Sequence, residues 1–210
     1  MLNENEAADT TSILIVDDHE LAVSGLRLLI QEPQYEIVDN LKTGAEVAQF
    51  FNTKSADIVL LDLGLPDVDG LTLLSELVAV HDATVIVLSG ISDATQLISA
   101  SKLGARAVVS KSDPSAVILE AINAVNRGEQ FTSPYVSELF ASAEPSNTTL
   151  SPRQMAILRF LAAGETNKEI GYRLRIAPPT VSFHLREIRE KLGVDSNRKI
   201  VEAARVYGLI

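Results

Sequence analysis

The chain has 210 residues, 46% of them hydrophobic, and a formal net charge of −10. This apolar content is sufficient for one large or two small packed domains and excludes an intrinsically disordered chain. The absence of cysteine excludes disulfides, thiolate zinc sites and cysteine nucleophiles.

The charge is unevenly divided. Residues 1–149 contain 7 Lys and Arg against 22 Asp and Glu, whereas residues 150–210 contain 11 against 6. Because neutralisation of phosphates drives nucleic-acid binding, only the basic end is expected to meet nucleic acid.

The first residues form a polar, acidic stretch, and we expect a disordered tail over 1–11. It has neither the basic start nor the apolar run of a secretory signal. No apolar stretch reaches the roughly 18–20 residues of a membrane helix, so a cytoplasmic protein is expected.

From residue 12 to 130, short apolar runs alternate with helical patterns. The runs are rich in Val, Ile and Leu without alternation, as in strands covered on both faces. They are Ile13–Val16, Tyr35–Val38, Ile58–Leu61, Val85–Leu88 and Ala107–Val109. The helical segments are about 20–31, 43–53, 70–80, 93–102 and 113–126. Five such units predict an α/β doubly wound, five-stranded parallel sheet.

Residues 131–149 are predicted to be a linker, with a possible short helix at Pro134–Ala143. Its last part, 144–149, has a linker-like composition and coincides with the change in charge.

Residues 150–210 predict a small all-α domain of four helices. The first begins at Ser151, with Gln154 at capping-box spacing, and ends at Gly164. The others are about Asn167–Leu174, Pro178–Leu192 and 196–207. A short helix, a short turn and a longer amphipathic helix are typical of a helix-turn-helix.

Polar residues stand where the predicted strands end. They are Asp17, Asp18, Asp62, Ser89 and Lys111. In an open parallel sheet these positions share the carboxyl edge, where ligands bind. Clustered carboxylates suit a hard divalent cation such as Mg²⁺, and a lysine could pair with phosphoryl oxygens. The pattern therefore favours phosphoryl transfer onto a carboxylate.

Each feature alone has a simpler interpretation. An acid pair after a strand is commonly a capped turn, and Asp67 and Asp69 are interpreted as turn residues. His19 and His81 are expected to be surface or cap residues. Only the agreement of four strand ends supports the phosphoryl-acceptor interpretation.

In the third helix of the basic end, one stripe is apolar: Val181, Leu185, Ile188 and Leu192. Phe183 then points away from this stripe, with Ser182 and Arg186 beside it, which suits a helix in a DNA major groove. The alternative is that Phe183 packs on another subunit or on the acidic domain. Residues that could hold phosphates are Asn167, Lys168, Thr180 and His184, although His184 could equally be partly buried.

The motifs DD (17–18), LLDLGLPDVDG (60–70), LSG (88–90) and SK (110–111) resemble the CheY-like receiver domain of two-component systems, a flavodoxin-like fold, over about residues 12–127. The resemblance implies that Asp62 is the phosphoacceptor. It also implies that Asp17 and Asp18 form an acid pocket, and that Asp18, Asp62 and the Gly64 carbonyl hold Mg²⁺. Ser89 and Lys111 are implied to contact the phosphate. The sequence departs at Val108, where many receivers have an aromatic residue that takes part in the switch.

LSPRQMAILRFLAAGETNKEI and TVSFHLREIREKLGV resemble the LuxR-type helix-turn-helix over about 148–210. Together, the two parts look like a NarL/FixJ-type response regulator. This resemblance implies DNA contacts from Ser182, Phe183 and Arg186. It implies dimerisation through the fourth helix, where the candidate residues are Ser196, Ile200, Ala203, Ala204 and Tyr207.

We therefore expect a two-component response regulator and not an enzyme. A histidine kinase would phosphorylate Asp62, and this would control dimerisation and sequence-specific binding to double-stranded DNA. RNA polymerase is a further candidate partner. The opposite charges of the two parts suggest that the acidic receiver masks the basic domain before phosphorylation.

The sequence is compatible with two alternatives. One is a DNA-binding regulator whose receiver is not phosphorylated in use, for which Val108 is the main support. The other is a haloacid-dehalogenase-like phosphatase, which needs a second Asp two residues after the nucleophile, where this chain has Gly64.

Overall fold

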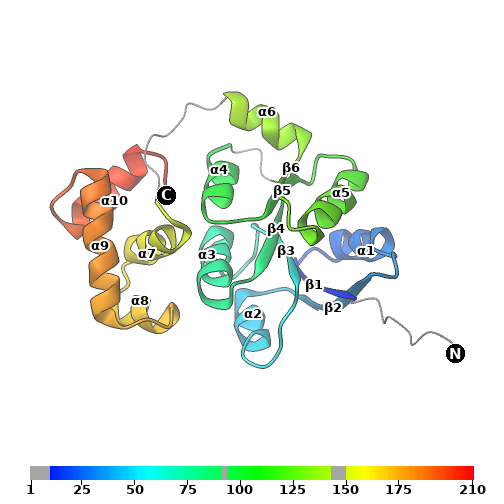
Figure 1. The fold of residues 1–210 in the computed structure, drawn as a ribbon, viewed down its shortest axis with the longest axis horizontal. Helices are drawn as coiled ribbons and strands as arrows, with labels where there is room; N and C mark the ends of the chain where they lie inside the picture. Colours follow the sequence, from blue (N-terminus) through cyan, green and yellow to red (C-terminus); the bar gives the residue numbers. More distant parts are fainter. Residues whose placement is uncertain (1–9, 91–93, 143–149) are drawn as a thin grey trace, which may run out of the picture.

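A parallel sheet forms the centre of the first half of the chain (Figure 1). The computed structural model describes residues 10–90, 94–142 and 150–210. The strands are β1 (Thr11–Val16), β2 (Tyr35–Leu41), β3 (Ile58–Asp62), β4 (Thr84–Ser89), β5 (Ala107–Ser110) and β6 (Phe131–Thr132). Their order is β2-β1-β3-β4-β5-β6, and every neighbouring pair is parallel. The doubly wound fold is confirmed, and the predicted count of five strands is corrected by the short β6.

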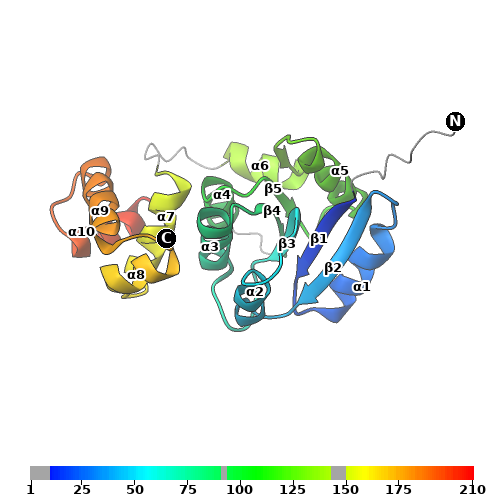
Figure 2. The ribbon, with the colours of Figure 1, turned by 60° about the horizontal axis from the view of Figure 1, so that its bottom comes forward.

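Five helices cover the two faces of the sheet, as Figure 2 shows from the side. One face carries α1 (Glu20–Leu29) and α5 (Ser115–Asn126). The other carries α2 (Gly44–Phe50), α3 (Gly70–His81) and α4 (Ala94–Lys102). Residue 93, the predicted start of the fourth helix, lies outside the described residues.

Successive side chains of each central strand enter different cores. Ile13 and Ile15 of β1 pack with α1 and α5, whereas Leu14 and Val16 pack on the opposite face. All four are fully buried. Because both faces exclude water, the strands need apolar residues at every position, which is why the sequence lacks alternation.

The segment predicted as a linker contains structure that belongs to the sheet. Phe131 and Thr132 of β6 pair with Ala107 and Val108 of β5. The following helix, α6 (Pro134–Ser142), packs against α4 and β5. Residues 143–149 lie outside the described part of the chain, as do residues 1–9 of the predicted tail. Thr11, also assigned to that tail, is instead the first residue of β1.

Four helices form the C-terminal part: α7 (Pro152–Ala162), α8 (Asn167–Arg173), α9 (Pro178–Leu192) and α10 (Asn197–Val206). The capping box of Ser151 and Gln154 is present at the start of α7. Gly193, with φ 67°, ends α9. Gly171 allows the close approach of the turn between α8 and α9, since a Cβ there would lie 2.7 Å from the carbonyl oxygen of Ile176. The predicted helix-turn-helix is confirmed.

The two halves are packed together through α3 and α7, which lie side by side in Figures 1 and 2. A hydrophobic cluster continues from the sheet face under α3 into the C-terminal part. Two ion pairs border this contact: Arg159 Nη1 lies 3.0 Å from Asp69 Oδ2, and Arg173 Nη1 lies 3.8 Å from Glu76 Oε2. Helix α9 lies on the side of α7 and α8 away from the sheet (Figure 1), so direct covering of α9 by the acidic half is not observed.

None of the helices in the described ranges is long and apolar enough to span a membrane.

Candidate functional site

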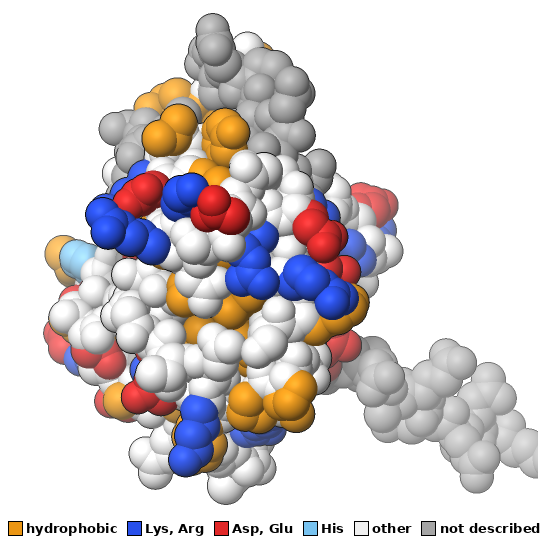
Figure 3. Space-filling view, turned by 90° about the vertical axis from the view of Figure 1, so that its left-hand side faces the viewer, with side chains coloured by type: hydrophobic (Ala, Val, Ile, Leu, Met, Phe, Trp, Pro, Cys, Tyr) orange, Lys and Arg blue, Asp and Glu red, His pale blue; other side chains and the backbone are white. Residues whose placement is uncertain are grey.

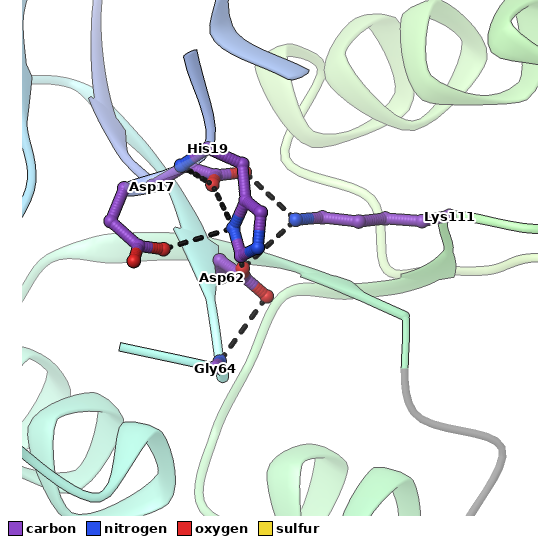
Figure 4. A network of polar contacts seen from close by, with 6 residues as sticks. Asp17, His19, Asp62, Gly64 and Lys111 are labelled. Carbon is purple, nitrogen blue, oxygen red and sulfur yellow. Dashed lines mark hydrogen bonds and ion pairs between the residues drawn. The ribbon is translucent and has the colours of Figure 1, made fainter. Parts of the chain in front are cut away.

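The carboxyl ends of β1, β3 and β5 bring two acids and one lysine into direct contact (Figure 4). Lys111 Nζ donates to Asp17 Oδ2 at 2.8 Å and lies 2.9 Å from Asp62 Oδ2. These residues are far apart in sequence, and they meet because parallel strands end at one edge of the sheet. The structure thus groups Asp17, Asp62 and Lys111 as the sequence pattern predicts.

The charges of this cluster are sheltered from water. Asp17 and Asp62 are only 2% and 5% exposed. Burial lowers the pKa of Lys111, but its hydrogen bonds and Coulombic attraction to Asp17 and Asp62 outweigh burial and leave the pKa above its usual range. The ammonium therefore stays charged and offsets part of the repulsion between the carboxylates.

The acidic residues fit a divalent cation. Asp17, Asp18, His19 and Asp62 each offer one ligand atom, and these atoms lie within 4.8 Å of one another. Asp18 Oδ1 is buried and accepts no hydrogen bond from the described residues, which leaves a lone pair for a metal ion. The Gly64 amide donates to Asp62 Oδ1 at 3.3 Å, so Gly64 lies beside the Asp62 carboxylate. An oxygen-rich donor set of this kind suits Mg²⁺.

His19 belongs to this cluster, which the sequence analysis missed. It is the N-cap residue of α1, as a cap interpretation predicts, but its ring makes no capping hydrogen bond. Instead, Nδ1 lies 2.9 Å from Asp18 Oδ1, 3.2 Å from Asp17 Oδ1 and 3.6 Å from Asp62 Oδ2. The available sequence clue was its position directly after the acid pair, at the same strand end.

An open cavity gives access to the Asp62 carboxylate. It has a volume of about 430 Å³, and its lining includes His19, Leu21, Asp62 and Lys111. Ser89 ends the adjacent strand β4 and is fully buried, and its carbonyl accepts from the Lys111 amide at 2.8 Å. A ligand in the cavity can reach Asp62 and Lys111 together.

The loop after Asp62 caps two helices. Asp67 accepts from the amides of Gly44 and Ala45 at the start of α2. Asp69 caps α3 by accepting from the Thr72 amide at 2.9 Å. The interpretation of Asp67 and Asp69 as turn residues is confirmed, and Asp69 has the additional partner Arg159.

A second candidate surface lies on α9. Ser182, Phe183 and Arg186 are exposed, and the Arg186 guanidinium carbon lies 5.0 Å from the centre of the Phe183 ring. Phe183 remains 47% exposed. An apolar ring and a guanidinium side by side can contact a thymine methyl and a guanine edge.

The predicted phosphate contacts surround this surface. Asn167, at the start of α8, donates from Nδ2 to Ser182 Oγ at 3.0 Å, which joins α8 to α9. Lys168 and Thr180 are exposed. His184 is partly buried and lies 3.2 Å from Glu187, so it is already engaged within α9.

Charges on the helical end of the molecule are mixed. In Figure 3, which faces this end, Lys and Arg side chains lie next to Asp and Glu side chains. Pairs along the helices account for part of this: Arg186 with Glu190, Arg198 with Glu202, and Lys199 with Asp195. A nucleic acid would therefore meet paired side chains, not a uniformly basic surface.

The predicted dimer residues on α10 need correction. Ile200 and Ala204 are fully buried, because the amphipathic face of α10 packs on its own domain core. They are not available to a second chain in this conformation. Ser196 caps α10, Ala203 is partly buried and Tyr207 is 46% exposed. Val206, which the sequence analysis omitted, is 82% exposed.

Comparison with known families divides the chain into the same two parts, the half that contains the sheet and the C-terminal helical part. Residues 13–123 match the model of the response regulator receiver domain. Residues 148–204 match the model described as bacterial regulatory proteins, luxR family.

Similar proteins cover nearly the whole chain. A putative transcriptional regulator of Pseudomonas aeruginosa is 32% identical over 95% of this chain and 100% of its own length. The nitrate/nitrite response regulator protein NarP of Escherichia coli is 33% identical over 88% of this chain and 89% of its own. A structure of the Salmonella typhimurium response regulator RcsB, 23% identical, covers 94% of this chain and 99% of its own with a TM-score of 0.63, which shows the shared fold.

Proposed function

The chain belongs to the two-component response regulators that join a receiver domain to a LuxR-type helix-turn-helix, and we propose that phosphorylation of Asp62 controls its dimerisation and its sequence-specific DNA binding. The receiver domain corresponds to about 12–130 and the DNA-binding domain to about 150–210. The proposal rests above all on Lys111 Nζ, which lies within 2.9 Å of both Asp17 and Asp62 beside an open cavity.

The phosphoryl donor is a histidine kinase. A carboxylate oxygen of Asp62 attacks the phosphorus atom, so that a P–O bond forms while the P–N bond of the donor histidine breaks. Asp18, Asp62 and the Gly64 carbonyl would hold Mg²⁺, which supplies positive charge to shield the incoming phosphoryl oxygens. Asp17 completes the acid pocket.

After transfer, the phosphate changes what its neighbours bind. The phosphoryl group on Asp62 carries a charge of about −1.5 to −2, in place of the single negative charge of the free carboxylate. Lys111 then pairs with phosphate oxygens, and the Ser89 hydroxyl moves toward them. Because β5, which precedes Lys111, pairs with β6 and packs against α6, a shift there can pass to the segment leading into the DNA-binding domain.

The output is a homodimer bound to promoter DNA. Ser182, Phe183 and Arg186 of α9 read base edges, while Asn167, Lys168 and Thr180 hold phosphates. His184 belongs to this surface through its ring contact with Phe183, at 5.7 Å between ring centres. The exposed end of α10, with Ala203, Val206 and Tyr207, is the dimer surface, and Ser196 fixes the start of that helix. The protein acts in the cytoplasm, and RNA polymerase is a further candidate partner.

The decisive experiment is phosphorylation with acetyl phosphate and Mg²⁺, followed by intact mass measurement and sedimentation velocity. We expect one added phosphate, absent from Asp62→Asn, and a larger sedimentation coefficient for the modified protein. No added phosphate would contradict the proposal.

That negative result would favour a regulator whose receiver acts without phosphorylation. One observation supports this alternative: Val108 is 2% exposed and carries no aromatic ring that could change rotamer. Its carbonyl accepts from the Ser133 amide at 3.0 Å, which ties β5 to the residue before α6.

A further inference from the structure

The ring nitrogen of His19 lies among three carboxylates. Nδ1 contacts Asp17 Oδ1, Asp18 Oδ1 and Asp62 Oδ2 at 3.2, 2.9 and 3.6 Å (Figure 4). Carboxylates only accept hydrogen bonds, so an Nδ1–H facing them is a donor. His19, Lys111 and the Gly64 amide therefore supply polar hydrogens that face the acidic cluster.

The same carboxylates would have to surround a bound cation. Mg²⁺ needs oxygen ligands at about 2.0–2.1 Å in a nearly octahedral arrangement. While Nδ1, 2.9 Å from Asp18 Oδ1, carries the hydrogen that faces these carboxylates, it has no lone pair to offer the ion. In this position the ring therefore competes with the ion for the same oxygens.

His19 is well placed to leave. Its side chain is 64% exposed, whereas those of Asp17 and Asp62 are 3% and 7% exposed. The backbone is fixed independently of the ring, because the His19 amide donates to Asp17 Oδ1 at 2.8 Å. Rotation of the side chain can thus clear the cluster while the start of α1 stays in place.

We propose that His19 acts as a displaceable stand-in for the cation: its ring stabilises the metal-free receiver and weakens Mg²⁺ binding. This rests on the proposed function, because it concerns the magnesium site of the same receiver. The role of His19 is positional, since it sets how much cation is needed before Asp62 is ready to accept a phosphoryl group.

The test is direct titration of Mg²⁺ into the metal-free full chain by calorimetry at one fixed pH. His19→Ala should tighten Mg²⁺ binding by roughly 2- to 10-fold, the range expected for a partly exposed charge-assisted hydrogen bond. His19→Asn should lie between wild type and His19→Ala, because its amide can donate at about the same position as Nδ1. His81→Ala, which removes the histidine at the end of α3, is the matched control and should not change the Mg²⁺ affinity.

Thermal unfolding supplies a second measurement that separates this role from simple packing. Without Mg²⁺, His19→Ala should melt below wild type, because the carboxylates lose a donor. With saturating Mg²⁺ the difference should disappear, because the ring is already displaced in wild type. A merely structural role would lower both melting temperatures.

The outcomes are distinguishable. Unchanged or weaker Mg²⁺ binding by His19→Ala would overturn the proposal, and weaker binding would identify His19 as a metal ligand. If Asp18→Asn still lost Mg²⁺ binding in that case, the proposed function would stand. If wild type and His19→Ala both failed to bind Mg²⁺, the magnesium site itself would be wrong.

Discussion

Arg159 of α7 donates from Nη1 to Oδ2 of Asp69 at 3.0 Å, and so joins the DNA-binding domain to the residue that caps α3. Asp69 stands in the loop that follows Asp62, so the partner of Arg159 is connected directly to β3. The Arg159 side chain is only 10% exposed, which makes the loss of its partner costly while the domains stay together.

We expect Asp69→Asn to separate the two domains in part. Asn remains a good N-cap for α3 but cannot neutralise Arg159, so the guanidinium is better solvated in an open arrangement. Small-angle scattering should record a larger radius of gyration than wild type. Asp67→Asn, which alters the cap of α2 and lies outside the Arg159 contact, is the control. Identical scattering from Asp69→Asn and wild type would show that this pair does not hold the domains together.

A pH dependence is expected from His81, at the end of α3. Burial lowers its pKa, and Arg175 of the DNA-binding domain lowers it further. The ordinary histidine pKa is about 6.5, so the unfolded chain binds the proton first as the pH falls. Stability contributed by neutral His81 is therefore complete above that value and is lost as the pH drops toward the folded-state pKa.

Melting temperatures at pH about 7.5 and about 5.5 test this. His81→Gln should lose less stability on acidification than wild type. Glu76 acts in the opposite direction, because burial raises its pKa, and it is unchanged in this comparison. If His184→Gln reduced the acid sensitivity as much as His81→Gln, the effect could not be assigned to His81.

On α9, Arg186→Ala should weaken specific DNA binding by ~1–3 kcal/mol and relax the preference at one base pair. The measurement is fluorescence anisotropy on an operator selected from a randomised pool, with unrelated DNA for comparison. Arg198→Ala removes an equally charged and more exposed side chain from α10, and it should leave sequence preference unchanged. An equal loss of affinity for specific and for unrelated DNA would show that Arg186 contacts a phosphate and does not read a base.

At the end of α10, Tyr207→Glu should prevent dimerisation of the protein treated with beryllium fluoride, because a charge would replace half-exposed aromatic surface. Sedimentation velocity should then show a monomer where wild type gives a dimer. Tyr172→Glu places the same charge at an exposed tyrosine of α8 and should still dimerise. A dimer of the Tyr207 variant would place the interface elsewhere.

The fold and the grouping of Asp17, Asp62 and Lys111 followed from the sequence because both depend on regular geometry. Short apolar runs reveal buried strands, and parallel strands bring their carboxyl ends together. Asp17, Asp62 and Lys111 could therefore be grouped without any knowledge of side-chain positions.

Other features depend on packing that no local pattern records. β6 has two residues, too few to show a period, and it forms only because it can pair with β5. The direction of the His19 ring is set by acids on two strands. The apolar face of α10 could have packed either on a partner or on the core of its own domain. In the structure, Ile200 and Ala204 pack in the core of their own domain.

The hydrophobic cluster that runs from beneath α3 into the DNA-binding domain makes the contact between the two domains depend on temperature. Contact driven by apolar burial weakens on cooling, whereas ion pairs such as Arg159–Asp69 do not share that loss. Cold should therefore favour the undocked form, so that the two halves of this protein become more independent at low temperature.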